Sequence, residues 1–543
     1  MLTPSSDTRG PPGASVLCVT LPTPTHDVVI VGGGHNALVA AAYLARAGRS
    51  VLLLERQDHT GGAAVSARAF EGVDARLSRY SYLVSLLPQQ IQDDLGLDIR
   101  LAHRRYSSYT PLPGDPAGRG LLVDRTDAAA TAASFAEIGA ASDARGFDTL
   151  YEATGSIAAA LWPTVTGPLP TRSEARALVG DDAVWDAVFE RPIGEFIESH
   201  VDDDLVRGVV LTDALIGTFA SAHQGDLQQN RCFLYHVIGG GTGDWDVPIG
   251  GMGTVTTQLD AAARAAGAEI RTGAEVTGIR PDGTVVFRTS AGAETVAGRH
   301  VLAGVAPAVL DELMGTPSAA RVPRPHGAQV KVNLLLRRLP RLRDESVAPE
   351  AAFGGTFHIN EGYAQLQDAY GQAAGGEIPT ILPCEIYCHS LADRTILGDD
   401  LAATEAQTLT VFALHTPSDL VSAESLDAQR ARLQRAVLDS LDSVLAEPIE
   451  DLLLVDAEGR PCIETKTTLD LERALNMPGG NIFHGPLSWP FLEDDAPRDT
   501  PAQRWGVATA HERILLCGSG AVRGGAVSGL GGHNAAMAVL ESD

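Results

Sequence analysis

Residues 27–55 read DVVIVGGGHNALVAAAYLARAGRSVLLLE. The first five are mostly β-branched and predict a short buried strand that stops at Gly32-Gly33-Gly34. A helix is predicted over 38–47, with Gly48 closing it, and 50–54 predicts a second strand that ends at Glu55. This order of strand, glycine turn, helix, strand and acid is the G-x-G-x-x-A form of a dinucleotide-binding βαβ unit.

The residue types in this unit each have a physical task. Gly32 permits the tight turn, and Gly34 has no Cβ, so a pyrophosphate can approach the backbone. Ala37 is small enough for the helix to pack on the strand, and Asn36 precedes it at the helix start. The helix N-terminus offers free N–H groups to phosphates. Glu55 stands where the acid that holds a ribose hydroxyl is expected.

The loop after Glu55 indicates which of two dinucleotide cofactors, FAD or NAD, the site would bind. Arg56 follows the acid, and Gly61-Gly62-Ala63 forms a second glycine doublet. Flavin sites use such a doublet where the chain passes along the pyrophosphate toward the isoalloxazine ring, whereas an NAD site does not need it. We therefore predict FAD. The alternative interpretation is a plain flexible turn.

The C-terminal segment repeats the theme of strand, glycine loop and helix. A strand is predicted over 514–517 and a helix over 534–540, with Gly518, Gly525 and Val527 in the glycine-rich loop between them. Such a loop aims backbone N–H groups at an anion or a polarised carbonyl, here the flavin N1–C2=O locus. The chain thus begins and ends at one nucleotide.

The middle of the chain must leave the nucleotide domain and return to it. Strands predicted over 269–271, 275–279 and 284–289 form a return, with Val276 near the adenine. Strands over 328–336, 380–387 and 408–414 and a helix over 426–445 predict a sheet with helices on one side. We predict a disordered extension (1–25), three FAD-binding segments (26–105, 226–320, 456–543) and two substrate-domain segments, one helical (106–225) and one of sheet plus helix (321–455).

Composition narrows the class of protein. The 543 residues carry 41 Lys and Arg against 68 Asp and Glu, a net charge of −27. Such an acidic chain repels nucleic acid, and we expect no nucleic-acid partner. No apolar run is long enough for a membrane span. Six scattered cysteines suit a reducing cytoplasm. Cys384 and Cys388 would share a strand face, as two buried small hydrophobes or as a redox or metal pair.

Five segments together resemble one family, and they span residues 26–543. They are VVIVGGGHNALVAAAYLARAG, LLERQDHTGGAA, VPIGGMG with AARAAGAEIRTGAEV, MPGGNIFHGPLSW and LCGSGAVRGGAVSGLGGHNAA. The chain resembles the phytoene-desaturase-like FAD-dependent oxidoreductases, which include carotenoid desaturases and isomerases and the pyridine nucleotide-disulfide oxidoreductase domain-containing proteins. The resemblance implies an α/β fold of amine-oxidase-like architecture, with a discontinuous Rossmann-like FAD-binding domain and a mixed-sheet and helical substrate domain.

Several residues are candidates for the substrate side of the flavin. Tyr235, His236 and His484 are the catalytic candidates, although His236 also fits a core histidine with a satisfied hydrogen bond. The resemblance places Tyr80 and Tyr82 beside the isoalloxazine. His35 and His533 each begin a His-Asn pair at a helix start, and they either bind FAD phosphate or cap helices. Further aromatic residues are interpreted either as pocket or as core: Trp245, Phe353, Phe357 and Trp489.

These patterns predict a flavoenzyme that dehydrogenates an apolar small molecule. The electron acceptor is oxygen, a quinone or a nicotinamide, and peripheral membrane contact is compatible with the sequence. One alternative is a flavin amine oxidase, which needs an aromatic cage and a clamp for the substrate. The other is a non-catalytic lipid or prenyl escort on the same fold, against which the intact glycine loops and Glu55 argue.

Overall fold

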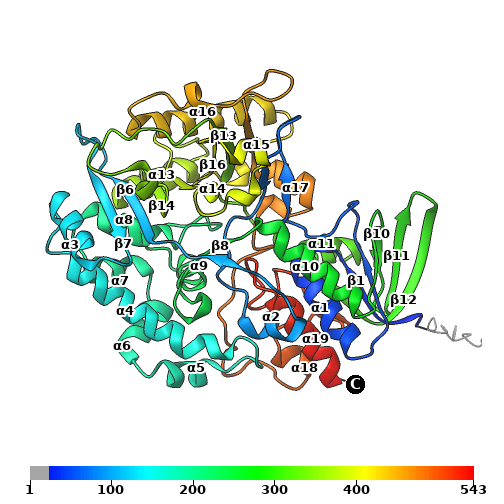
Figure 1. Ribbon diagram of the computed structural model, residues 1–543. Coiled ribbons are helices and arrows are strands. Elements are labelled where there is room, and N and C mark those ends of the chain that lie inside the picture. The colour runs from blue at the N-terminus through cyan, green and yellow to red at the C-terminus, as the bar shows by residue number, and fades with distance from the viewer. Residues whose placement is uncertain (1–23, 543) are drawn as a thin grey trace, which may run out of the picture.

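A computed structural model describes residues 24–542, and two seven-stranded sheets organise them (Figure 1). The predicted extension, with Cys18, falls almost entirely outside the described residues. In the first sheet the order is β10-β11-β12-β1-β2-β9, and β18 pairs with β12. Its strands are β1 (His26–Val31), β2 (Val51–Leu54), β9 (Glu269–Arg271), β10 (Glu275–Ile279), β11 (Thr284–Thr289), β12 (Gly292–Ala303) and β18 (Ile514–Leu516).

Both faces of this first sheet are covered, which explains the continuous apolar run of β1. Val28 and Ile30 pack against the helices α1 (His35–Arg46), α10 (Met252–Ala265) and α19 (Leu530–Ser542). Val29 and Val31 face the opposite layer, formed by β10, β11 and α11 (Pro307–Leu313). β1 pairs in parallel with β2 and β12, so the loops that leave these strands meet at one edge.

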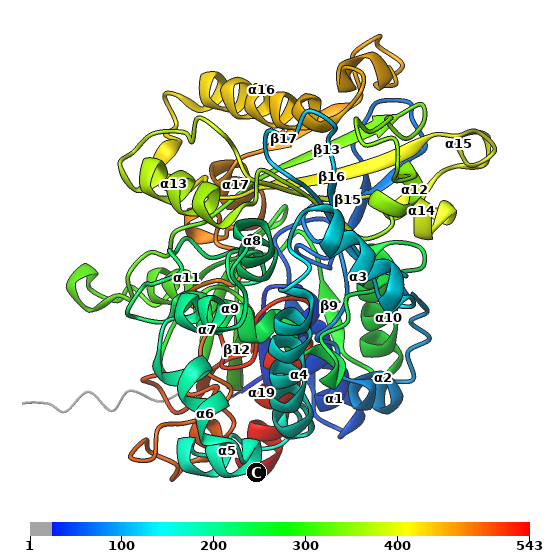
Figure 2. The ribbon, with the colours of Figure 1, turned by 90° about the vertical axis from the view of Figure 1, so that its left-hand side faces the viewer.

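The second sheet lies above the first in Figure 2. Its strand order is β17-β13-β16-β15-β14-β6-β7. Helix α16 (Leu426–Val444) covers its outer face through Leu433, Val437 and Leu441. The strands are β6 (Tyr106–Pro111), β7 (Gly120–Asp124), β13 (Val330–Leu336), β14 (Thr356–Ile359), β15 (Cys384–Tyr387), β16 (Gln407–Ala413) and β17 (Ile463–Lys466).

A group of helices between residues 128 and 237 forms a third body beside the two sheets. Leu150, Trp185 and Phe233 are at or below 1% exposed in its core. The helices are α3 (Ala128–Glu137), α4 (Ala144–Leu161), α5 (Arg172–Val179), α6 (Asp182–Trp185), α7 (Ile193–His200), α8 (Asp204–Thr212) and α9 (Gln228–Val237).

Shorter elements complete the chain. They are β3 (Ser66–Arg68), β4 (Arg76–Ser78), β5 (Leu101–Ala102), β8 (Val247–Pro248), α2 (Gln89–Leu95), α12 (Pro349–Ala352), α13 (Tyr363–Ala374), α14 (His389–Ala392), α15 (Asp399–Ala402), α17 (Thr468–Leu475) and α18 (Pro501–Arg504). Among the described residues, no helix combines the length and apolar character that a membrane crossing requires.

The structure shortens the strand that was predicted to carry both Cys384 and Cys388. β15 begins at Cys384 and ends at Tyr387, and Cys388 lies at the start of α14. Only Cys384 is therefore a strand residue, but both cysteines are buried in the same core cluster, as two small apolar side chains would be. The six predicted domain segments stay a proposal. We note that β17, inside segment 456–543, pairs with β13 of the second sheet.

Candidate functional site

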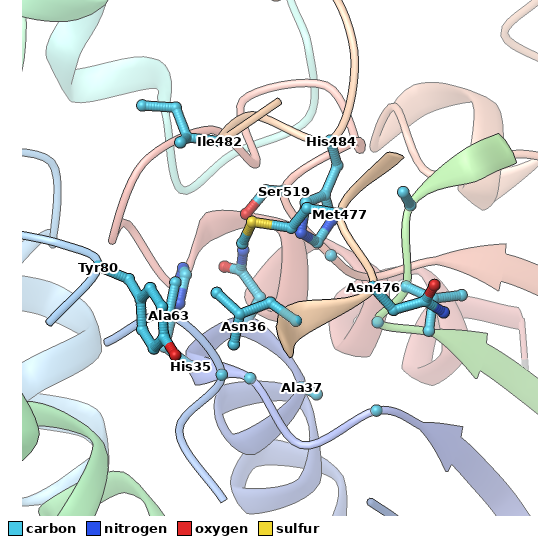
Figure 3. Close-up of a pocket in the computed structure, with 18 of the residues that line it drawn as sticks. His35, Asn36, Ala37, Ala63, Tyr80, Asn476, Met477, Ile482, His484 and Ser519 are labelled. Carbon is cyan, nitrogen blue, oxygen red and sulfur yellow. The ribbon is translucent and has the colours of Figure 1, made fainter. Parts of the chain in front are cut away.

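One cavity of about 310 Å³ begins at the turn after β1 and extends to the aromatic side chains of the helical body. The β1–α1 turn, the end of β2, residues 80–83, α9, and the segments 476–484 and 518–527 contribute to its wall. Figure 3 shows side chains from several of these segments gathered around it. The two ends of the chain and its middle therefore meet at one place.

The glycine turn leaves space for a ligand at the N-terminus of α1. Gly32 has φ +92°, a backbone conformation that favours glycine. A Cβ added at Gly34 would meet no protein atom within 4 Å, although Gly34 lies in the cavity wall. No side chain caps the first turn of α1, so its free N–H groups remain available to an anion. This cradle fits a pyrophosphate.

Glu55 fastens the end of β2 to the same turn. The backbone N–H of Gly33 donates to one carboxyl oxygen at 2.6 Å, and that of Gln57 donates to the other at 2.8 Å. Gly62 comes so close that a Cβ there would lie 3.1 Å from the Cα of Gly34. Arg56 donates to the backbone oxygen of Ala474 at 2.7 Å, which attaches the C-terminal end of α17 to the cavity wall.

Four buried polar atoms in the cavity wall have no hydrogen-bond partner among the described residues. They are Oγ of Ser81, Nε2 of His35, Oδ1 of Asn36 and Nδ1 of His484, and the last three residues are labelled in Figure 3. Burial lowers the pKa of His35 and of His484 to about 4, so both rings are neutral at pH 7. Buried polar atoms are almost always paired. Their positions fit the polar edge of a bound ring system.

The inner half of the cavity is aromatic. Tyr82 stacks on Trp245 with ring centroids 5.8 Å apart and packs against Phe412 at 4.9 Å. Trp245 also stacks on His236 at 5.2 Å. Among the described lining residues the Asp, Glu, Lys and Arg side chains are Glu55, Arg56 and Glu275, all at the nucleotide end. This half therefore suits an apolar ligand.

His236 presents a defined tautomer to the aromatic half. Its Nδ1 lies 2.9 Å from the backbone oxygen of Cys232, and because a carbonyl only accepts, Nδ1 carries the proton. In the neutral ring Nε2 then keeps its lone pair. The indole N–H of Trp245 donates to the His236 backbone oxygen at 2.8 Å and holds the two residues together.

A buried arginine fixes the C-terminal glycine loop. The Arg523 side chain donates to the backbone oxygens of Thr164, Gly167 and Pro490, each at 2.9 Å. Arg523 has φ +65°, and Ala526, which lines the cavity, has φ +56°. Such conformations cost about 1 kcal/mol or more and persist where surrounding contacts impose them. Arg523 supplies those contacts.

Comparison with known proteins places the chain in a family. Residues 30–91 match the NAD(P)-binding Rossmann-like domain. The uncharacterized protein Rv0897c of Mycobacterium tuberculosis is 60% identical over 523 residues, which is 95% of this chain and 97% of that protein. The chain belongs to the family of this mycobacterial protein. A more distant relative is pyridine nucleotide-disulfide oxidoreductase domain-containing protein 2 of Rattus norvegicus, 29% identical over 95% of this chain and 94% of that one.

Solved structures show the same fold. A putrescine oxidase with bound putrescine aligns over 95% of this chain and 98% of its own, with a TM-score of 0.54 and 18% identity. The predicted fold class is confirmed: the chain has a mixed α/β fold with a Rossmann-like nucleotide-binding domain, and its structural neighbours include amine oxidases.

Most predicted site residues lie in the cavity wall. The catalytic candidates Tyr235, His236 and His484 line it, as do Tyr80, Tyr82 and His35. So do the predicted cofactor residues Gly32, Gly34, Asn36, Ala37, Glu55, Arg56, Gly62, Ala63, Val276, Gly518 and Val527. Gly61 and Gly525 stand one layer behind, since a Cβ at Gly61 would meet Val65 at 2.7 Å and one at Gly525 would meet Leu487 at 2.6 Å.

Four aromatic or imidazole candidates lie outside this cavity in the described structure, and one of them, Phe353, is 1% exposed in the core of the second sheet. His533 packs edge-on against Tyr43 at 5.1 Å beneath the site. Phe357 is fully buried in the core of the second sheet, and Trp489 packs against Phe189 at 5.0 Å. The positions of these residues in the sequence could not distinguish pocket from core, because aromatic rings occur in both.

Sequence reasoning missed some lining residues. They include Phe412, Phe483, Met477 and Ser519. Phe412 lies on β16, where every second residue faces the cavity side, but which face that is depends on the packing of two sheets. Met477 and Phe483 lie in the segment MPGGNIFHGPLSW, whose glycine pair is the sequence signal of an irregular loop. In the structure these two glycines have φ +63° and +68°.

Proposed function

We propose that the protein is an FAD-dependent oxidoreductase that dehydrogenates an apolar small molecule. The observation that carries this proposal is the single cavity, which runs from a glycine cradle with free N–H groups to an aromatic chamber, with its Asp, Glu, Lys and Arg side chains confined to the nucleotide end. A dinucleotide long enough to follow that cavity would place its ring system against the aromatic half. The resemblance to phytoene-desaturase-like enzymes agrees with this assignment.

The chain offers matched positions for each part of FAD. Gly34 and the start of α1 would hold the pyrophosphate, Glu55 the ribose and Val276 the adenine. His35, Asn36 and His484 would meet the polar edge of the ring through their unpartnered atoms. The flavin supplies a two-electron acceptor when it is bound. A nicotinamide dinucleotide would use the cradle but would leave the unpartnered Nδ1 of His484 unexplained.

The residues around the aromatic chamber then have distinct tasks. Tyr82, Trp245 and Phe412 exclude water from the reacting carbon atom. Nε2 of His236 accepts the proton released there, because the ring's other nitrogen is committed to Cys232. Burial raises the pKa of Tyr235, so this phenol stays protonated and acts as a hydrogen-bond donor or an apolar wall. His484, neutral at pH 7, faces the cofactor half.

A flavin amine oxidase is the second candidate, and one observation favours it. Tyr82, Tyr235, Trp245 and Phe412 surround the chamber, and aromatic faces also attract an ammonium group. The amine-oxidase neighbours share the fold but only 15–18% of the sequence. We rank this candidate second because no carboxylate side chain lines the aromatic half within the described residues.

An anaerobic reduction assay distinguishes the two candidates. The flavin absorption of the purified protein is followed while a prenyl alcohol, an alkene or a long-chain aldehyde is added, and in parallel while the matching amines are added. We expect the absorption band to bleach with an apolar compound and to persist with amines. Bleaching by amines alone, with hydrogen peroxide released in air, would establish the second candidate and overturn the first.

A further inference from the structure

A second cavity, of about 270 Å³, lies against the outer side of the aromatic chamber. Leu83 lines both cavities. Tyr387 lines the second one and packs against Tyr82 of the first, with ring centroids 4.8 Å apart. The partition between the two spaces is therefore one layer of side chains thick.

The second cavity has basic groups in its wall although the chain as a whole is strongly acidic. Arg104, Arg105, His103 and His389 line it, together with one exposed carboxylate, Glu350. Two of these bases are already paired: Arg105 with Asp124 at 2.7 Å, and His103 with Asp246 at 2.9 Å. Because each is paired with a carboxylate, neither offers a free positive charge to a ligand.

Arg104 is different from its neighbours. Its Nε donates to the backbone oxygen of Trp245 at 2.8 Å and one terminal nitrogen donates to the Thr356 hydroxyl at 3.0 Å. Among residues 24–542 it has no ion pair at contact distance, and its other terminal nitrogen has no acceptor. Asp246 and Glu385 attract it only from farther away. Trp245 belongs to the aromatic chamber, so Arg104 is anchored directly to the partition.

His389 adds a second group without a partner. Its side chain is 6% exposed, it lines the same cavity, and its Nε2 is buried with no hydrogen-bond partner within the described chain. The cavity thus holds a guanidinium N–H without an acceptor and an imidazole nitrogen that can donate to a carboxylate in the tautomer with its proton on Nε2.

We propose that the second cavity binds the anionic end of an amphipathic substrate, a long-chain carboxylic acid, whose apolar chain displaces the Leu83 side chain from the partition and so enters the aromatic chamber. This inference rests on the proposed function and names its substrate class. Arg104 and His389 hold the carboxylate, and the chamber holds the segment that is oxidised. The acid end fixes how deep the chain enters, and thus which carbon lies beside the cofactor.

Calorimetric titration of the flavin-loaded protein with dodecanoate and with 1-dodecanol tests the inference. We expect the acid to bind about 10-fold more tightly or better, the effect of one charge-assisted contact. Arg104→Met should abolish this preference, Arg104→Lys should keep part of it, and Arg105→Gln, in the same cavity but already paired, should keep it in full. Acetate should bind far more weakly than dodecanoate.

Equal affinity for acid and alcohol, binding of neither, or a preference that survives Arg104→Met would overturn the inference. If acetate bound as tightly as dodecanoate, the apolar chain would contribute nothing to binding, and the inference would also be overturned. The wild-type comparison of acid and alcohol does not depend on how any variant folds. A protein that holds FAD but ignores the carboxylate contradicts this inference alone, whereas a protein without FAD contradicts the proposed function.

Discussion

The Nδ1–H of His236 donates to the backbone oxygen of Cys232, one helical turn earlier, at 2.9 Å. This bond fixes the imidazole in the tautomer whose Nε2 lone pair is free. His236→Gln keeps the size of the side chain but removes that base. We expect the reduction of the flavin by substrate to slow by about 100-fold or more, with the FAD content unchanged.

Tyr235→Phe is the matched control for His236, since Tyr235 lines the same chamber and precedes His236 on α9. It should change the rate of flavin reduction less than His236→Gln does. Stopped-flow absorbance measures both variants. If the flavin of the His236→Gln protein were reduced at the wild-type rate, His236 would not be the base.

Substitution of Gly34 separates cofactor binding from folding. A Cβ at this position would contact no protein atom within 4 Å, so Gly34→Val should leave the melting temperature of the cofactor-free protein within about 2 °C of wild type. The same side chain would occupy the space of the pyrophosphate, and FAD should be lost. Gly532→Ala is the contrasting variant: its Cβ would approach the Asn36 backbone oxygen to 1.7 Å, so stability should fall by about 1–3 kcal/mol or more. Stoichiometric FAD in Gly34→Val would refute the assignment of the cradle.

Two tryptophans distinguish the chamber from the core. Trp245 lines the cavity, so Trp245→Ala should shift the flavin absorbance or its rate of reduction. Trp489 packs against Phe189 and Phe491 outside it, so Trp489→Ala should lower the free energy of unfolding by about 3 kcal/mol without altering the flavin. Absorbance spectra and thermal melts of both variants make the comparison. The chamber would be misplaced if Trp489→Ala alone changed the flavin.

Buried histidines make stability depend on pH. His415 is 2% exposed, and burial lowers its pKa to about 3. The unfolded chain therefore binds more protons than the folded one between pH 6.5 and 3, so this contribution is complete above pH 6.5 and is lost as the pH falls toward 3. It amounts to about 3–5 kcal/mol over that range.

His415→Asn tests this contribution without entering the cavity. Asparagine tolerates the positive φ of +52° at this position and does not titrate. Urea unfolding of both proteins at several pH values should show a shallower loss of stability for the variant below pH 6.5. Parallel curves for the two proteins would contradict the lowered pKa of His415.

Local patterns predicted the nucleotide-binding part of the fold well. The β1–α1–β2 unit, the strands of 269–289 and the glycine loop before α19 are each specified by neighbouring residues, because turns and dinucleotide cradles need glycine at fixed places. The 12-residue β12 was not predicted. It pairs antiparallel with β11 and then in parallel with β1, and that bend depends on partners far along the chain.

The substrate side could be predicted only in part, because it too depends on contacts between segments far apart along the chain. His236 and Tyr235 were found because they precede a glycine run, whereas Phe412 and Arg104 carry no local signal. Their role comes from the second sheet meeting the helical body, which brings β16 and residue 104 to Trp245. Leu83 links two cavities only once both surfaces are assembled.

The most direct measurement is the cofactor content of the purified wild-type protein, obtained from its visible spectrum and from mass spectrometry of the ligand released on denaturation. We expect one FAD per chain, with the absorption bands of a bound flavin. A colourless protein that takes up no added FAD, or one that releases NAD(P) instead, would contradict this expectation.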